Sequence, residues 1–362
     1  MLTELDPKTD TAAAPLKGLG AIDCDVHPRL PRRLDLAPHA PKYWAEMFDY
    51  RAIDRQELMT YATSTLPLRP EDPTVQADAA GMARAHLDPM GVDAAILNVL
   101  SGAHAAYDPY LASAMCEATN RWLAEEWLDR DPRLRASALV PFQHPEAAVA
   151  EIERLSQDRR FVQILAVLGG EKPLGRREYW PIYRAAAEHG FALGVHPGGT
   201  NRHAPGQSGF AATRVEEVTL HIQTFASQVA SLVAEGVFNE FPALRVVLME
   251  SGISWLPGLM WRMSKDWKGA RIEVPWLERP PIEIMTRHFR VTTQPFDGPA
   301  DPAVAARVLD QLPDPGMLLW SSDFPHRHAH RGLPAGLPEA LHPGVWGGNA
   351  LATYARLELT HA

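Results

Sequence analysis

The chain has 362 residues, 46% of them hydrophobic, and a formal net charge of -9 at pH 7. This length and apolar content suit one soluble domain with a large core, and the negative charge argues against nucleic acid or an anionic membrane as the partner. No stretch approaches the roughly 20 apolar residues that span a bilayer, and residues 1–17 lack a secretory signal. Two cysteines, Cys24 and Cys116, are too few for a disulfide framework. We therefore expect a cytoplasmic protein with a small-molecule substrate.

Short apolar runs rich in β-branched residues alternate with longer stretches of helical pattern along the chain. The predicted strands are Ala21–His27, Val92–Val99, Arg135–Val140, Phe161–Val167, Ala192–His196, Arg245–Glu250, His288–Thr293 and Met317–Ser322. The predicted helices include Pro109–Trp127, Pro145–Gln157, Trp180–His189, Val215–Glu235 and Pro302–Leu312. Strands that alternate with helices in this way predict an α/β fold of the (β/α)8 TIM-barrel type.

The predicted barrel has one long insertion after its first strand. We expect residues 1–18 to be a disordered leader and residues 19–362 to form a single barrel domain, with the insertion at about 29–74. The insertion is rich in Pro, Tyr and Met and contains Tyr43 and Trp44. Because it leaves the carboxyl end of a barrel strand, where active sites lie, it is expected to act as a lid or a subunit contact.

The first predicted strand ends in three acid/base side chains at alternate positions, Asp23, Asp25 and His27, directly before Pro28. Alternate side chains of a strand point to the same face, so two or three metal ligands are expected to converge at its carboxyl end. The alternative is that the acids only cap nearby backbone groups.

Three later strands also end in residues that can bind a metal ion. His196 ends the fifth strand, Glu250 ends the sixth and Asp323 follows the eighth. Each has a structural explanation when taken alone: a hydrogen-bonded core histidine, a helix-capping partner or a turn-forming acid. Four such strand ends in barrel register favour a shared site at the carboxyl face.

The sequence resembles the amidohydrolase superfamily, and within it the branch that includes aminocarboxymuconate-semialdehyde decarboxylase and resorcylate decarboxylases. The resemblance runs from Ile22 to Tyr354. It is carried by Asp25-Val-His27, Met90-Gly-Val-Asp93, Tyr179-Trp-Pro-Ile-Tyr183, Val195-His-Pro197, Gly236–Val246, Glu250-Ser-Gly252, Ser322-Asp-Phe-Pro-His326 and Gly348-Asn-Ala350. It implies a divalent metal held by Asp25, His27, His196 and Asp323, with Asp323 also able to take a proton from metal-bound water.

Three positions depart from the pattern of the family. Asp25 replaces the first histidine of the common His-x-His, which favours a harder ion such as Mn or Fe(II) over Zn. Glu250 stands where the decarboxylases often have a proton-donating histidine. The fourth strand lacks the lysine that bridges two ions in binuclear members, because Lys172 comes too late in the chain.

These departures leave a two-ion site open as an alternative. With His221 and Glu250 added, the set reaches six donors: Asp25, His27, His196, His221, Glu250 and Asp323. Carboxylate-rich dinuclear Fe or Mn sites support oxygen activation as well as hydrolysis. The alternative for His221 is an ordinary histidine on a helix.

We therefore expect a metal-dependent enzyme that hydrolyses or decarboxylates a small organic acid or amide. Asp323, Glu250 and His221 are the predicted catalytic groups, and His326, Arg327 and Arg290 are the predicted substrate-binding groups. One Zn, Mn or Fe ion is expected, with two as the alternative. A dinuclear oxygenase (a hydroxylase) and a metal-binding structural partner of a catalytic homologue are the other candidate functions. From the resemblance we also expect a homo-oligomer, or a hetero-oligomer with a homologue.

Overall fold

The computed structural model describes residues 18, 20–53, 73–106, 108–199, 209–326 and 332–359. Its centre is a parallel eight-stranded sheet in which each strand pairs with the next along the chain. The strands are β1 (Ile22–Val26), β2 (Ala94–Leu97), β3 (Leu134–Leu139), β4 (Phe161–Gly169), β5 (Ala192–Gly199), β6 (Val246–Leu248), β7 (Phe289–Thr292) and β8 (Leu318–Leu319). All eight predicted strands are therefore present.

Backbone hydrogen bonds join the last strand to the first. Cys24 N donates to Trp320 O at 3.0 Å, and His27 N donates to Phe324 O at 2.8 Å. In the other direction, Asp323 N donates to Asp25 O at 3.1 Å. The sheet is thus closed into the predicted TIM barrel, and its β1–β8 seam runs between two residues of the predicted metal site.

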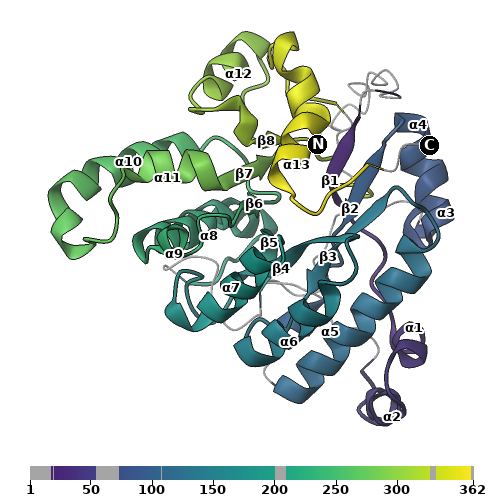
Figure 1. Ribbon diagram of the computed structural model, residues 1–362. Helices are drawn as coiled ribbons and strands as arrows, with labels where there is room; N and C mark the ends of the chain where they lie inside the picture. The colour runs from purple at the N-terminus through teal and green to yellow at the C-terminus, as the bar shows by residue number, and fades with distance from the viewer. Residues whose placement is uncertain are drawn as a thin grey trace.

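Helices surround the barrel (Figure 1). They are α1 (Arg33–Leu36), α2 (Lys42–Tyr50), α3 (Ala79–Met82), α4 (Asp88–Met90), α5 (Pro109–Leu123), α6 (Pro145–Leu155), α7 (Trp180–Glu188), α8 (Arg214–Ala234), α9 (Val237–Glu240), α10 (Leu256–Ala270), α11 (Pro281–His288), α12 (Pro302–Leu309) and α13 (Asn349–Thr353). Several start at residues that favour a helix N-terminus. Asp108 caps α5 in front of Pro109, and Thr213 forms a capping box with Glu216 on α8.

The described part of the insertion packs along the outside of α5. His39 lies 3.1 Å from Glu125, and Arg51 lies 3.4 Å from Asp108. On α2, Phe48 is buried, whereas the side chains of Tyr43 and Tyr50 are 63% and 86% exposed. Residues 54–72 of the insertion and the predicted leader up to residue 17 lie outside the described residues. The lid or subunit-contact role remains a prediction.

Several strands end earlier than the sequence predicts. β6 stops at Leu248 and β8 at Leu319, although the apolar runs continue. The backbone then turns sharply, because Glu250 and Asp323 have φ angles of 51° and 60°. Non-glycine residues rarely adopt this left-handed region, and such residues cluster at functional sites.

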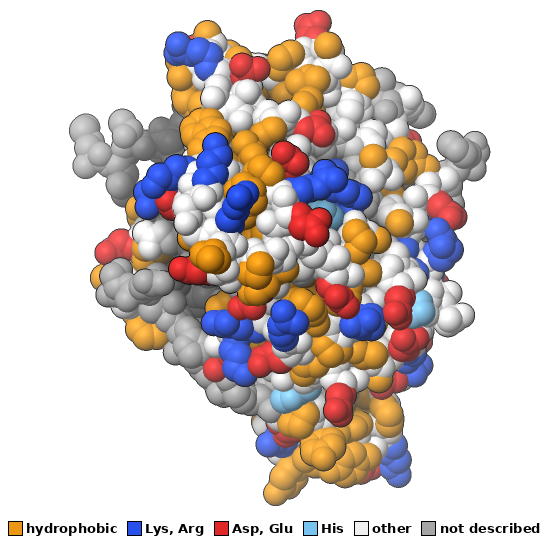
Figure 2. Space-filling view, turned by 60° about the vertical axis from the view of Figure 1, so that its left-hand side comes forward, with side chains coloured by type: hydrophobic (Ala, Val, Ile, Leu, Met, Phe, Trp, Pro, Cys, Tyr) orange, Lys and Arg blue, Asp and Glu red, His pale blue; other side chains and the backbone are white. Residues whose placement is uncertain are grey.

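The surface of the protein carries mixed charge. Figure 2 shows acidic and basic side chains interspersed over the face in view, with apolar side chains between them. None of the described helices is long and apolar enough to cross a lipid bilayer.

Candidate metal centre

The end of β1 supplies two buried donors, Asp25 and His27. His27 donates from Nδ1 to the carbonyl of Asn98 at 3.0 Å, so that Nε2 faces the carboxylates. The distance from His27 Nε2 is 3.0 Å to Asp323 Oδ1, 3.4 Å to Asp25 Oδ1 and 3.5 Å to Glu250 Oε1. A hydrogen bond from Nδ1 to a backbone carbonyl fixes the orientation of the imidazole ring and leaves Nε2 available as a metal ligand.

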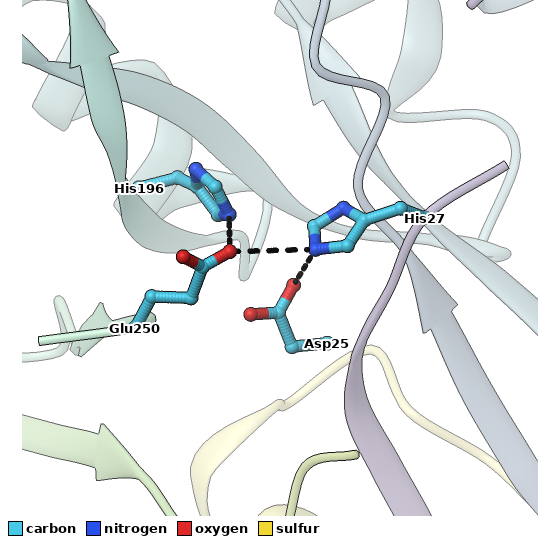
Figure 3. A group of neighbouring side chains, drawn as sticks. All are labelled: Asp25, His27, His196 and Glu250. Carbon is cyan, nitrogen blue, oxygen red and sulfur yellow. Dashed lines mark ion pairs between the residues drawn. The ribbon is translucent and has the colours of Figure 1, made fainter. Parts of the chain in front are cut away.

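His196 in the second half of β5 and Glu250 just after β6 complete the group (Figure 3). His196 uses Nδ1 to donate to the carbonyl of Pro197 at 2.8 Å, and its Nε2 lies 2.8 Å from Glu250 Oε1. Donor atoms of Asp25, His27, His196 and Glu250 all lie within 4.8 Å of one another. This spacing suits the coordination of one ion.

The loop after β8 adds a second, overlapping group. Donor atoms of His27, Glu250, Asp323 and His326 also lie within 4.8 Å of one another. Within it, His326 Nδ1 lies 2.6 Å from Asp323 Oδ1. The sequence predicted His326 as a substrate-binding residue, but here it lies against the carboxylate of a predicted ligand.

Burial and mutual attraction set the protonation of the centre. Burial raises the pKa of Asp25 to about 6, although His27 and His196 oppose the shift. For the two histidines, burial lowers the pKa, but the neighbouring carboxylates outweigh it and hold the pKa of both above the usual value, that of His27 well above. Burial raises the pKa of Glu250, but the attraction of His196 outweighs burial and holds this pKa well below the usual value. Without a metal ion, the positive charges of the protonated His27 and His196 rings therefore offset the negative charges of the buried carboxylates.

The residues fit a divalent cation. Asp25 Oδ2 is buried and forms no hydrogen bond, so one carboxylate oxygen has an unused acceptor site. Mixed imidazole and carboxylate donors suit Zn, Mn and Fe, and a cation would replace the imidazolium protons as the counter-charge.

A buried polar row inside the barrel supports Asp25, and sequence reasoning missed it. Asn98 donates from Nδ2 to Asp25 Oδ1 at 2.8 Å, and its Oδ1 accepts a short hydrogen bond from Ser137. Gln163 in turn donates to Ser137 Oγ at 2.8 Å. Asn98 directly follows the apolar run Ala94–Leu97, and a polar residue at this end of a barrel strand was the signal that could have identified it.

Other predicted residues lie outside the two groups. Asp23 accepts a hydrogen bond from His86 at 2.7 Å. Lys172, which the sequence excludes as a bridging ligand, pairs with Glu178 at 2.7 Å on the surface. His221 is half-buried on α8 and belongs to neither group of donors. Arg327 lies outside the described residues.

Arg290 lies at the opposite end of the barrel. Its guanidinium donates to the carbonyls of Thr286, Arg287 and Phe289, where α11 ends and β7 begins. These carbonyls lie at the amino-terminal end of β7, whereas the metal-ligand candidates lie towards or just after the carboxyl ends of their strands. We therefore drop Arg290 from the predicted substrate-binding residues. The predicted strand includes Arg290, but a strand pattern does not give the direction of a long side chain.

The fold resembles solved structures over nearly its whole length. An amidohydrolase from Mycobacterium avium subsp. paratuberculosis K-10 matches with a TM-score of 0.71 and 19% identity over 92% of this chain and 97% of its own. A 2,6-dihydroxybenzoate decarboxylase from Rhizobium matches with a TM-score of 0.66 and 20% identity over 93% and 98%. A dihydroxybenzoic acid decarboxylase from Polaromonas sp. JS666 with bound manganese has the same TM-score and identity over 93% and 97%.

Sequence comparison gives the family. A gamma-resorcylate decarboxylase from Rhodococcus jostii is 30% identical over 194 residues, which is 48% of this chain and 56% of the relative. One from Rhizobium sp. is 28% identical over 228 residues, 57% of this chain and 66% of the relative. The chain thus spans about three fifths of the length of these curated relatives. The sequence profile of the amidohydrolase family matches residues 22–356, and the chain therefore belongs to this family.

Proposed function

We propose that this chain is a metal-dependent enzyme that decarboxylates a small organic acid, with hydrolysis of a small acid or amide as the second candidate. The observation that carries the proposal is the convergence of Asp25, His27, His196 and Glu250 within 4.8 Å at the carboxyl ends of three barrel strands. Decarboxylation is favoured by the relatives, which are gamma-resorcylate decarboxylases. Hydrolysis is favoured by Glu250, a carboxylate that can take a proton from water.

We propose that Asp25, His27 and His196 hold one divalent ion. Asp323, which lies 3.0 Å from His27 Nε2, is the further ligand that the resemblance implies, and the carboxylate of Glu250 lies beside the ion. Such an ion polarises a substrate oxygen or lowers the pKa of a bound water. The two donor groups share His27, and its Nδ1 is bonded to Asn98. Only Nε2 is left, and one nitrogen serves one ion. A second ion would have to rely on Glu250, Asp323 and His326, so the two-ion oxygenase is the weaker alternative.

Glu250 is the proposed proton-transfer group. Its side chain is 17% exposed, whereas those of Asp25 and His196 are 0% and 3% exposed. Glu250 is therefore the most accessible of the four donors Asp25, His27, His196 and Glu250. Its carboxylate Oε1 is held 2.8 Å from His196 Nε2, which fixes the oxygen that accepts or returns the proton. The resemblance places a proton-donating histidine here. The lowered pKa of Glu250 keeps its carboxyl group ionised, so it would first accept a proton and return it in a later step.

The proposal is tested on protein prepared separately with Zn, Mn and Fe(II). Each preparation is given 2,6-dihydroxybenzoate, related aromatic acids and a set of amides, and the release of carbon dioxide and the cleavage of amides are followed. Carbon dioxide release with about one ion per chain is the expected result. Cleavage of amides alone would make the chain a hydrolase. Two iron ions with oxygen consumption would favour the oxygenase, and bound metal without any turnover would favour the structural partner.

A further inference from the structure

A second buried polar cluster lies at the β1–β8 seam, beside the proposed metal centre. It consists of Asp23 on β1, His86 on a π-helical turn (η5, Ala83–Leu87) and Ser322 after β8, and all three side chains are 0% exposed. His86 Nε2 lies 2.7 Å from Asp23 Oδ2 and 3.3 Å from Ser322 Oγ. Neither the metal centre nor the proposed chemistry uses these groups directly.

The carboxylate of Asp23 holds the backbone on both sides of the seam. Its Oδ1 accepts the backbone N–H of Ser322 at 3.0 Å and that of Asp25 at 3.3 Å. Ser322 Oγ accepts the N–H of Phe324 at 3.1 Å. The proposed ligand Asp25 and both chain neighbours of the ligand Asp323 are thereby bonded to this one cluster. A shift of the Asp23 carboxylate would move both ligand backbones.

His86 is the side chain that fixes this carboxylate. A buried carboxylate needs a strong donor, and the Nε2–H of His86 is the side-chain donor on Asp23 Oδ2. The ring of His86 also stacks on Phe324 at a centroid distance of 4.6 Å and an interplanar angle of 10°. Its Nδ1 is buried and forms no hydrogen bond, so the geometry assigns the proton to Nε2.

We infer that His86 is a positioning residue of the metal centre, which acts through Asp23 to hold the backbones of Asp25 and Asp323 at the spacing that binds the ion. The inference rests on the metal site proposed above. An experiment can distinguish a positioning role from a simple packing role. A packing residue changes the stability of the protein, whereas a positioning residue changes the affinity of the folded protein for metal.

Three substitutions of His86 separate the hydrogen bond from the stacking. The amide nitrogen of His86→Gln lies as many bonds from Cα as Nε2, so this variant keeps the donor to Asp23. The amide of His86→Asn reaches only the position of Nδ1 and loses it. His86→Phe keeps the aromatic contact with Phe324 and also loses the donor.

His288 offers a matched control at the other end of the barrel. It is 4% exposed, bonds from Nδ1 to Leu244 O at 2.9 Å and stacks on Phe238 at 4.4 Å. His288→Phe therefore also removes a buried hydrogen bond of a histidine ring, here to a backbone carbonyl, and keeps an aromatic contact. It touches no residue of the metal centre.

The test is titration of the metal-free full-length variants with manganese(II), followed by the EPR signal of free Mn(II), with unfolding temperatures measured in parallel. We expect His86→Phe and His86→Asn to bind Mn(II) about 10- to 100-fold more weakly than the wild type. His86→Gln should stay within about threefold, as should His288→Phe even where it is less stable.

Equal Mn(II) affinity in the wild type, His86→Asn and His86→Gln would overturn the inference. If His86→Phe does not fold, the comparison of Asn with Gln decides, because these side chains share their chemistry and differ only in reach. If the wild type binds neither Mn(II) nor Zn(II), the proposed metal site fails first, and the inference about His86 fails with it. A wild type that binds metal while the His86 variants match it refutes the positioning role alone.

Discussion

Replacing Glu250 by glutamine removes one of the three carboxylates that face His27 Nε2, while the side chain keeps its size and shape. Glu250 Oε1 lies 2.8 Å from His196 Nε2, and two unit charges at this distance attract by about 6 kcal/mol at an effective dielectric constant of about 20. Burial opposes much of this attraction, and hydrogen bonds to charged groups contribute a net of about 1.5 to 3 kcal/mol.

A bound cation takes the place of the imidazolium protons as the positive charge beside Glu250. We therefore expect Glu250→Gln to reduce the free energy of metal binding by about the same 1.5 to 3 kcal/mol, the net value of a hydrogen bond to a charged group. At about 1.4 kcal/mol per factor of ten, Glu250→Gln should weaken metal binding roughly 10- to 100-fold. At saturating metal, loss of the proton-transfer group should lower turnover by a further factor of about 100 or more.

The assay is metal titration of the folded variant, together with turnover of whichever substrate the wild type accepts. Glu151→Gln is the control, because Glu151 is also buried and bonds to Arg154 at 2.6 Å and to Asn120 at 2.7 Å, away from the donors. It should lose stability and keep its metal affinity. Wild-type affinity and wild-type turnover in Glu250→Gln would refute both roles proposed for this residue.

Three further outcomes are expected. His196→Ala or Asp323→Ala should bind little metal and have no activity while circular dichroism shows a folded barrel; full metal occupancy and normal turnover in both would remove these residues from the site. The metal-free protein should lose stability as the pH rises above about 6.5, because the raised pKa values of His27 and His196 favour the folded state only while the rings are protonated. Calorimetry checks this trend, and a stability that rises over the same range would contradict it. Light scattering should give at least a dimer, with the part of the insertion around Tyr43 and Trp44 at the interface or the pocket mouth; a monomer whose substrate affinity survives the change of both residues to serine would contradict this.

Much of the fold is determined by local sequence. The alternation of apolar, β-branched runs with helical segments predicts all eight strands, because each run must bury its side chains between the barrel interior and the helices. The strand-end donors Asp25, His27, His196 and Glu250 could be predicted for the same reason. Parallel strands bring their carboxyl ends to one face, so a polar residue at each end points to a shared site.

The tertiary structure decided how these side chains are used. Asp23 and Asp25 look alike in the sequence, yet one accepts His86 and the other lies against His27, since the partner of each carboxylate comes from another part of the chain. The sequence pattern predicts the strand that carries Arg290, but its flexible side chain turns to the carbonyls of Thr286 and Arg287 in the last turn of α11. The sequence pattern gives the strand to which a residue belongs and its position along that strand. The direction and partner of a long or buried polar side chain depend on contacts between segments distant in sequence, and only the folded chain supplies them.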